Sequence, residues 1–338
     1  MTPRLVCLDL RNGIVRPLRI PPPPTVLCLG NFDGVHLAHA ALLREGLRLT
    51  ERVNITRGAT VAEDRALCGV FCFFRPSGDY FLKANTHPTH LTTLKERIAA
   101  IRDLGAELLW LCDFPTVREL SPTAFVELLR HACGCVGTVC GYNHRFGQRA
   151  EGTPELLSAV FGANHTVVLP ALEIDGAPVS SSRIRAYIQA GDVEGASRLL
   201  GRPYFLETTV RHGKALAHTW GLPTANQIFP SDRLIPAHGV YAVRCHTPDG
   251  VFPGVANIGT RPTVDSSARG GASVNCETHI VGYDGNLYGR RLKVEFLKFL
   301  RPEQKFHGVD ELISAIQKDA QTAVAYVTSL DFPTMGDR

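Results

Sequence analysis

The sequence predicts an α/β domain with a Rossmann-like, doubly wound parallel sheet, followed by a smaller antiparallel β-barrel domain that ends in a helix. The chain has 338 residues, which suits two domains. In its first half, apolar segments typical of strands and of helices alternate with short loops between them. After about residue 205, strand-like segments recur with turns between them instead. We place the domains at residues 1–184 and 201–338, with a helical linker at 185–200.

Composition and charge argue against several classes of protein. Apolar residues make up 44% of the chain and charged residues 20%, and no apolar run approaches the roughly 18 residues of a membrane span. We expect no secretory leader after Met1. The net charge of +4 is small and dispersed, which argues against a nucleic-acid partner. The ten cysteines contain no C-x-x-C pair, so we expect reduced, mostly buried thiols in a cytoplasmic protein.

The first half supplies the elements of the α/β domain. We expect strands at 25–29, 108–112 and 136–141, and helices at 39–52, 91–104 and 121–131. Gly105 suits the end of the second helix. The pair Ser121-Pro122 suits the start of the third, because proline is tolerated in the first helical turn.

The second half supplies the barrel. We expect strands at 205–212, 239–246, 251–258, 274–281 and 293–300, and a final helix at 309–327. The segments 247–250 and 283–286 have turn composition. Residues 182–200 have a helical pattern that is interrupted at 190–192, and they form the joint between the two halves.

A candidate phosphate site follows the first predicted strand. Residues 30–39 lie where that strand ends and a helix begins, and a helix N-terminus has free N–H groups that favour phosphate. His36 and His39 are three residues apart on one face of this helix, so both can donate to phosphate oxygens. Two histidines at this spacing more often fill a core or bind a metal, but the strand–turn–helix setting favours the phosphate site here.

This segment also carries a family resemblance. Residues 30–39 fit G-x-F-D-G-x-H-x-x-H, which resembles the nucleotidyltransferase signature of the bacterial bifunctional riboflavin kinase/FAD synthetase family. Residues 91–97, 120–126, 141–147 and 179–185 resemble the family's L-T-T-x-x-E-K/R, L-S-P-x-x-F-V, G-x-[DN]-x-x-F-G and [IV]-S-S-T-x-I-R motifs, in that order. The resemblance extends over nearly the whole chain.

For the N-terminal domain, the resemblance implies FMN adenylyltransferase (FAD synthetase) activity. Its expected catalytic residues are His36 and His39, and its expected ATP and phosphate contacts are Gly30, Phe32, Asp33, Asn143, Ser181, Ser182 and Arg185. The attacking phosphate of FMN is already anionic, so such a site aligns the substrates and neutralises charge and needs no strong base.

Several residues depart from the family pattern. Ala38 stands where the family has glycine, and Ser182 where it has threonine. Residues 74–78 align with the family's F-D-P-H-P, so Arg75 and Ser77 replace its acid and its histidine. These changes leave open an alternative: a riboflavin kinase whose N-terminal domain is impaired or redirected.

Four motifs in the second half resemble riboflavin kinases. Residues 221–226 resemble G-F-P-T-A-N and 256–263 match A-N-I-G-x-R-P-T, while 284–289 and 299–306 resemble D-x-x-L-Y-G and F-[LI]-R-x-E-x-K-F. The resemblance implies Mg²⁺ at Thr224 and Asn226, a base at Glu277, ATP at Gly213 and Pro223, and flavin at Arg301 and Phe306. Hard oxygen ligands suit Mg²⁺, and an alcohol must lose a proton in order to attack ATP.

The expected small-molecule partners are riboflavin, FMN and ATP, with no nucleic acid and no membrane. The sequence identifies no protein partner. A flavin-binding protein without turnover is a further alternative, but binding alone does not require the combination of Thr224, Asn226 and Glu277.

Overall fold

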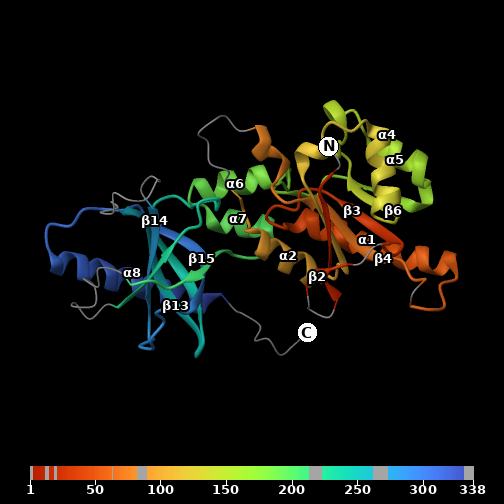
Figure 1. Ribbon diagram of the computed structural model, residues 1–338. Helices are drawn as coiled ribbons and strands as arrows, with labels where there is room; N and C mark the ends of the chain where they lie inside the picture. Colours follow the sequence, from red (N-terminus) through yellow and green to blue (C-terminus); the bar gives the residue numbers. More distant parts are fainter. Residues whose placement is uncertain are drawn as a thin grey trace. The chain divides into compact units, whose positions relative to one another are not determined.

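The computed structural model describes residues 3–11, 15–18, 21–62, 64–81, 90–212, 223–261 and 273–330. The chain divides into two compact units, Met1–Ser181 and Ser182–Arg338. Each unit has its own sheet, as the ribbon drawing shows (Figure 1).

The first unit is built on a seven-stranded sheet in the order β2-β1-β5-β4-β3-β6-β7. Its strands are β1 (Leu5–Asp9), β2 (Arg16–Pro17), β3 (Thr25–Leu29), β4 (Leu67–Phe73), β5 (Leu108–Cys112), β6 (Cys135–Gly141) and β7 (Thr166–Leu169). Strands β3 to β7 are mutually parallel, while β1 and β2 add an antiparallel edge. A separate pair, β8 (Glu173–Ile174) and β9 (Ala177–Pro178), follows.

Helices cover both faces of this sheet, so the predicted doubly wound fold is confirmed. One face packs against α1 (Leu37–Arg57) and α2 (Leu94–Asp103). The other packs against α3 (Phe114–Val117), α4 (Pro122–Glu127), the π-helical turn η3 (Leu128–Ala132) and α5 (Pro154–Phe161). All five residues of β3 are buried, as expected for a parallel strand with helices on both sides. Short 3₁₀ turns lie at η2 (Ser77–Phe81), η4 (Gln148–Ala150) and η5 (Ala163–His165).

Some helix bounds differ from the predicted ones, for example the helix expected at 39–52, which extends over Leu37–Arg57. The helix expected at 91–104 begins only at Leu94, because Thr93 and Glu96 form a capping box at its start. The helix expected at 121–131 is α-helical only to Glu127 and continues as the π-helical turn η3.

The second unit contains a six-stranded antiparallel sheet in the order β10-β15-β12-β13-β14-β11. Its strands are β10 (Tyr204–Thr209), β11 (Thr224–Ile228), β12 (Gly239–Thr247), β13 (Gly250–Arg261), β14 (Ser273–Ile280) and β15 (Arg291–Arg301). The edge strands approach each other, since the Arg211 amide donates to the Asn226 carbonyl at 2.8 Å. The buried Gln227 side chain donates to the carbonyls of Thr208 and Leu292, which joins β11 to the strands opposite. The predicted antiparallel barrel is therefore confirmed.

Among the described residues, three helices lie in this unit, except that the first of them begins at Ser181, the last residue of the first unit. α8 (Val309–Ser329) packs on β12 and β13 through Ala323, in the place expected for the final helix. The segment predicted as the helical joint forms α6 (Ser181–Gln189) and α7 (Val193–Leu200), and α7 packs on β10 and β15.

All ten cysteines are buried and unpaired, as predicted. Burial raises the pKa of several of them, for example Cys135 to about 12, so these thiols stay protonated at neutral pH. Within the described ranges, no cluster of three or more His, Cys, Asp or Glu side chains is arranged to bind a metal ion.

Candidate active sites

The turn between β3 and α1 has an unusual backbone. Phe32, Gly34 and Val35 have φ angles of 53°, 81° and 42°, in the left-handed region that favours glycine. Val35 is β-branched, so this conformation is strained, and strain of this kind is concentrated at functional sites. The turn ends at His36, the residue that immediately precedes α1.

His36 and His39 lie together at the start of α1. Their rings stack with centroids 3.7 Å apart, and the Phe32 ring stacks on the other side of His39 at 4.7 Å. Both histidines are largely buried in the protein and contribute to the wall of a cavity. The structure thus brings the two predicted catalytic histidines to one place, beside free N–H groups of a helix.

This cavity, of about 990 Å³, is the candidate nucleotide site of the first unit. Its apolar wall comes mainly from aromatic rings, namely Phe71, Phe73, Phe114, Phe125 and Phe146. Its polar wall includes Gly30, Asn31, Asn143, Arg145 and Ser181 together with the two histidines. The site therefore offers flat apolar surfaces for rings and a cationic and hydrogen-bonding region for phosphates.

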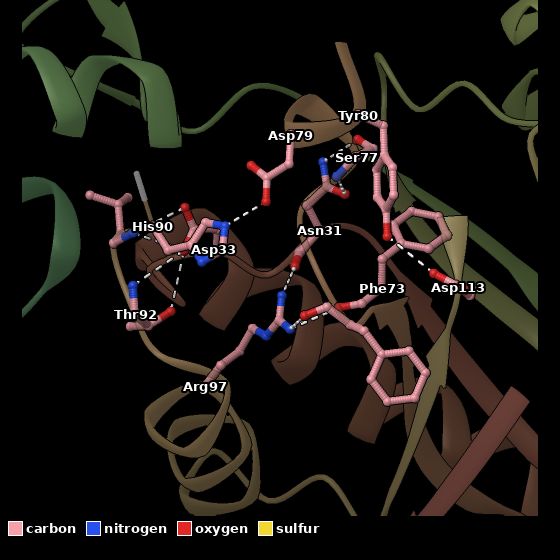
Figure 2. Close-up of polar contacts among 12 residues, drawn as sticks. Asn31, Asp33, Phe73, Ser77, Asp79, Tyr80, His90, Thr92, Arg97 and Asp113 are labelled. Atoms are coloured by element: carbon pink, nitrogen blue, oxygen red, sulfur yellow. Dashed lines mark hydrogen bonds and ion pairs between the residues drawn. The ribbon is translucent and has the colours of Figure 1, made fainter. Parts of the chain in front are cut away.

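Asp33 links the turn to other parts of the first unit, and its expected contact with ATP stays a prediction. Its buried carboxylate accepts hydrogen bonds from the backbone amides of Leu91 and Thr92 and from the Thr92 hydroxyl (Figure 2). Its carbonyl accepts from the Ser181 hydroxyl at 2.9 Å. Asp33 thus connects the turn to the chain before α2 and to the start of α6.

Phe32, Ser182 and Arg185, which are also predicted for this site, do not lie in the cavity wall. Phe32 is fully buried behind the cavity wall, and Ala38 lies in that wall. Ser182 is exposed and Arg185 is partly buried on α6, and neither lies in the cavity wall. Their contacts with nucleotide stay predictions.

His144 belongs to the cavity wall and was not among the expected residues. Burial, and secondly the charge of Arg145, lower its pKa from the ordinary 6.5 to about 4, so its ring is neutral at pH 7. Its Nε2 atom is buried and has no hydrogen-bond partner among the described residues. His144 lies inside the motif at 141–147, but its protonation state depends on its burial, which the sequence does not show.

The second candidate site lies on one face of β11, β14 and β13. Asn226 is directly opposite Glu277, which is in turn opposite Asn257, so the three residues form a row across the sheet. Thr224 and His279 form the neighbouring row. The predicted metal ligands and the predicted base are therefore adjacent on one surface.

The chemistry of these groups fits a hard cation. The Oδ1 atom of Asn226 is buried and accepts no hydrogen bond from a described residue. The Glu277 carboxylate, which is partly exposed, has no hydrogen bond or ion pair with a residue of the described ranges. Amide, hydroxyl and carboxylate oxygens are the ligands that Mg²⁺ prefers, together with water and phosphates.

Three further residues predicted for the second site, Pro223, Arg301 and Phe306, lie in the described part of the chain. The Pro223 carbonyl accepts a hydrogen bond from His279 Nδ1 at 3.1 Å, beside Thr224. The Arg301 guanidinium binds the Asp319 carboxylate of α8 at 2.8 Å and lies 5.7 Å from the Phe306 ring. Gly213 lies outside the described residues. The flavin contacts of Arg301 and Phe306 stay predictions.

The two folds and their sites together define a two-domain transferase. A family model for FAD synthetase matches residues 20–183, and one for riboflavin kinase matches residues 200–327. A bifunctional riboflavin kinase/FMN adenylyltransferase of Bacillus subtilis (strain 168) is 34% identical over 312 residues, which cover 90% of this chain and 93% of that protein. The protein of the same name in Escherichia coli (strain K12) is 32% identical over 327 residues, covering 94% and 97%.

The chain therefore belongs to the bifunctional riboflavin kinase/FMN adenylyltransferase family. A crystal structure titled as a macrolide-efflux protein from Streptococcus pneumoniae is also similar, with a TM-score of 0.76 and 26% identity, covering 94% of this chain and 97% of that one. In the described part of this chain, no helix combines the length and the apolar character needed to cross a bilayer.

Proposed function

We propose that this chain converts riboflavin to FMN in its C-terminal domain and FMN to FAD in its N-terminal domain. In the first step a ribityl hydroxyl of riboflavin attacks the γ-phosphorus of ATP, and ADP leaves. In the second step a phosphate oxygen of FMN attacks the α-phosphorus of a second ATP, and pyrophosphate leaves.

The kinase step needs a group that takes the proton of the hydroxyl. Glu277 suits this role because its carboxylate is partly exposed and makes no hydrogen bond or ion pair with another described residue. Thr224 and Asn226 would bind Mg²⁺, which neutralises charge on the ATP phosphates when it is present. Pro223 and Gly213 would contact the same nucleotide, and Arg301 and Phe306 the flavin.

The adenylyl step needs no strong base, because the attacking phosphate is already ionised. His36 and His39 would donate hydrogen bonds to the ATP phosphates and to the departing pyrophosphate, with the free N–H groups of α1 beside them. Asn143 and Ser181 lie in the same cavity wall and would position the nucleotide.

One observation carries the proposal: two sites with different chemistry occur in one chain. A stacked histidine pair at a helix N-terminus suits phosphate binding, while a row of amide and carboxylate groups suits metal-assisted phosphoryl transfer. A kinase with an impaired N-terminal domain is the second candidate, because Arg75 and Ser77 replace the acid and the histidine of the family pattern. A cytoplasmic location belongs to the proposal, since the ten thiols are unpaired.

The test is incubation of the purified chain with riboflavin, ATP and Mg²⁺, followed by chromatographic separation of the flavins. We expect FMN to appear first and FAD after it, with no conversion when EDTA removes Mg²⁺. Accumulation of FMN without FAD would favour the kinase-only candidate. Absence of both products would favour a binding protein.

A further inference from the structure

Ser77, the first residue of the turn η2 (Ser77–Phe81), lies in the cavity wall and is attached to the turn between β3 and α1. The Asn31 side chain donates from Nδ2 to the Ser77 hydroxyl oxygen at 3.1 Å, and its Oδ1 accepts from the Ser77 amide at 3.4 Å. Both residues line the cavity. This pairing defines which way the Asn31 amide is oriented, because its oxygen must face the Ser77 N–H group.

The orientation of Asn31 determines what the Ser77 hydroxyl can do. Since Asn31 donates, the Ser77 oxygen acts as the acceptor and its hydrogen remains available for another acceptor. No described residue accepts that hydrogen. The cavity beside it is where a substrate oxygen would lie.

A second pair attaches the turn η2 at another point. His90 Nε2 donates to Asp79 Oδ2 at 2.5 Å, and both side chains are largely buried (Figure 2). The backbone amides that follow His90 are bound by Asp33, which belongs to the same turn as Asn31. The contacts therefore form a continuous network that runs from Asn31 through Ser77, Asp79 and His90 to Asp33, and Asp33 lies in the same turn as Asn31.

Arg97 stabilises the same network through hydrogen bonds to backbone carbonyls. Its guanidinium, which is buried, donates to the carbonyls of Asn31, Phe73 and Phe74. The strand that leads into η2 and the turn that faces it are thus held by one side chain. Tyr80 adds a further attachment, since its hydroxyl donates to Asp113 Oδ1 at 3.1 Å.

We propose that Ser77 is a substrate-binding residue of the adenylyl-transfer site, donating a hydrogen bond to an anionic oxygen of the bound substrate, and that Asp79 and His90 position it. The proposal rests on the proposed function of the N-terminal domain. It makes Ser77 part of a rebuilt wall of a working site, in which the network of Asn31, Ser77, Asp79, His90 and Asp33 replaces the acid and the histidine of the family pattern.

The first test compares Ser77→Ala with Ser77→Thr, which keeps the hydroxyl. A hydrogen bond to a charged oxygen is worth about tenfold to a hundredfold in affinity, so we expect Ser77→Ala to lower kcat/KM for FAD formation by about that factor. Separate KM values for FMN and for ATP show which substrate Ser77 contacts, and Ser77→Thr restores most of the activity. Riboflavin phosphorylation by the same chain is the control for folding and stays unchanged.

The second test distinguishes positioning from mere stability. If Asp79 acts through Ser77, Asp79→Ala lowers FAD formation in the wild-type chain but adds little in a chain that already carries Ser77→Ala. His90→Gln keeps a donor near the place of Nε2 and retains activity, whereas His90→Ala loses it. Asp103→Ala, which removes an exposed acid on α2, is the matched control and has no effect.

The outcomes separate this proposal from the one on which it rests. Wild-type chain that makes FAD, with Ser77→Ala and Asp79→Ala within twofold of it, overturns the inference alone. Additive losses in the double variant overturn the positioning role. Wild-type chain that makes FMN but no FAD overturns the adenylyl-transfer function, and the inference with it.

Discussion

Glu277 and Glu295 are both carboxylates on strands of the barrel, but their surroundings give them opposite properties. Glu295 is buried among Arg244, His246 and Lys293. Burial alone would raise its pKa, but the close contacts with His246 and Lys293 and the charges of Lys293 and Arg244 outweigh this and lower it to about 2. A carboxylate held this way is a poor proton acceptor. Glu277 has no such partners in the described ranges, which supports the proposal that it serves as the base.

Glu277→Gln tests the assigned base directly. We expect riboflavin phosphorylation to fall by about 10²–10⁴, since this is what loss of a general base costs. FAD formation from supplied FMN stays within twofold of wild type, because that step uses the other site. The measurement is the rate of each step with its own substrate. Wild-type kinase activity in this variant would remove Glu277 from the mechanism.

His144 gives a prediction about pH. Its pKa is about 4 in the folded chain and 6.5 in the unfolded chain, so between these values the unfolded state binds more protons. The contribution of His144 to stability is therefore lost as pH falls from 6.5 to 4. His144→Phe, which does not titrate, should lose less stability over this range. Calorimetric melting of both chains at pH 7, 5.5 and 4 checks this, and parallel pH curves would contradict it.

Among the helices and strands, the sequence predicts those that a local pattern of apolar residues determines. β3 and β5 were predicted with their observed bounds because each is an uninterrupted apolar run. β4 is also such a run and is a strand that was not predicted. β11 could not be recognised by this signal, since Thr224, Asn226 and Gln227 are polar. It is a strand because β14 pairs with it and Gln227 bonds to distant carbonyls.

The same limit applies to the sites. His36 and His39 were placed together correctly because one strand–turn–helix unit carries both. Leu91 was expected inside a helix from its apolar spacing, whereas Asp33, 58 residues earlier, binds its amide. The Asn31–Ser77 pair joins residues 46 positions apart, and no periodicity signals such a contact. Polar contacts between residues far apart in the sequence therefore could not be predicted from the sequence, and only the structure shows them.

The β12–β15 pair of the barrel provides a prediction at this scale. Glu295→Gln leaves Arg244 without its buried carboxylate partner, which should destabilise the C-terminal domain by on the order of 3 kcal/mol at pH 7. The folded pKa of Glu295 is depressed, so its contribution is present above pH 4.5 and is lost as pH falls towards 2. The deficit of the variant should therefore shrink in acid. Calorimetric unfolding of both chains checks this, with Glu277→Gln as the matched control that keeps wild-type stability.

For the whole molecule, the two reactions are chemically consecutive but use separate machinery. The product of the kinase, FMN, is the nucleophile of the adenylyl transfer, and each reaction consumes its own ATP. Every residue of the cavity wall proposed for adenylyl transfer belongs to the first unit, whereas Ser182 and Arg185, whose nucleotide contacts stay predictions, fall in the second. The residues proposed for phosphorylation belong to the second unit. Damage to one site should therefore change which flavin accumulates without stopping the other reaction.

The double variant His36→Ala/His39→Ala tests this separation. Loss of preorganised donors to the transition state costs about 10²–10³ each, so FAD formation should become undetectable while FMN formation keeps its wild-type rate. Riboflavin given to this variant should then accumulate as FMN, whereas the wild-type chain carries it on to FAD. His131→Ala, which removes an exposed histidine outside the cavity wall, is the matched control and should leave both rates unchanged. If the double variant still made FAD at more than a tenth of the wild-type rate, the histidine stack would not be the phosphate-binding centre of the site. If it lost FMN formation as well, the two sites would depend on each other, and the assignment of one reaction to each unit would fail.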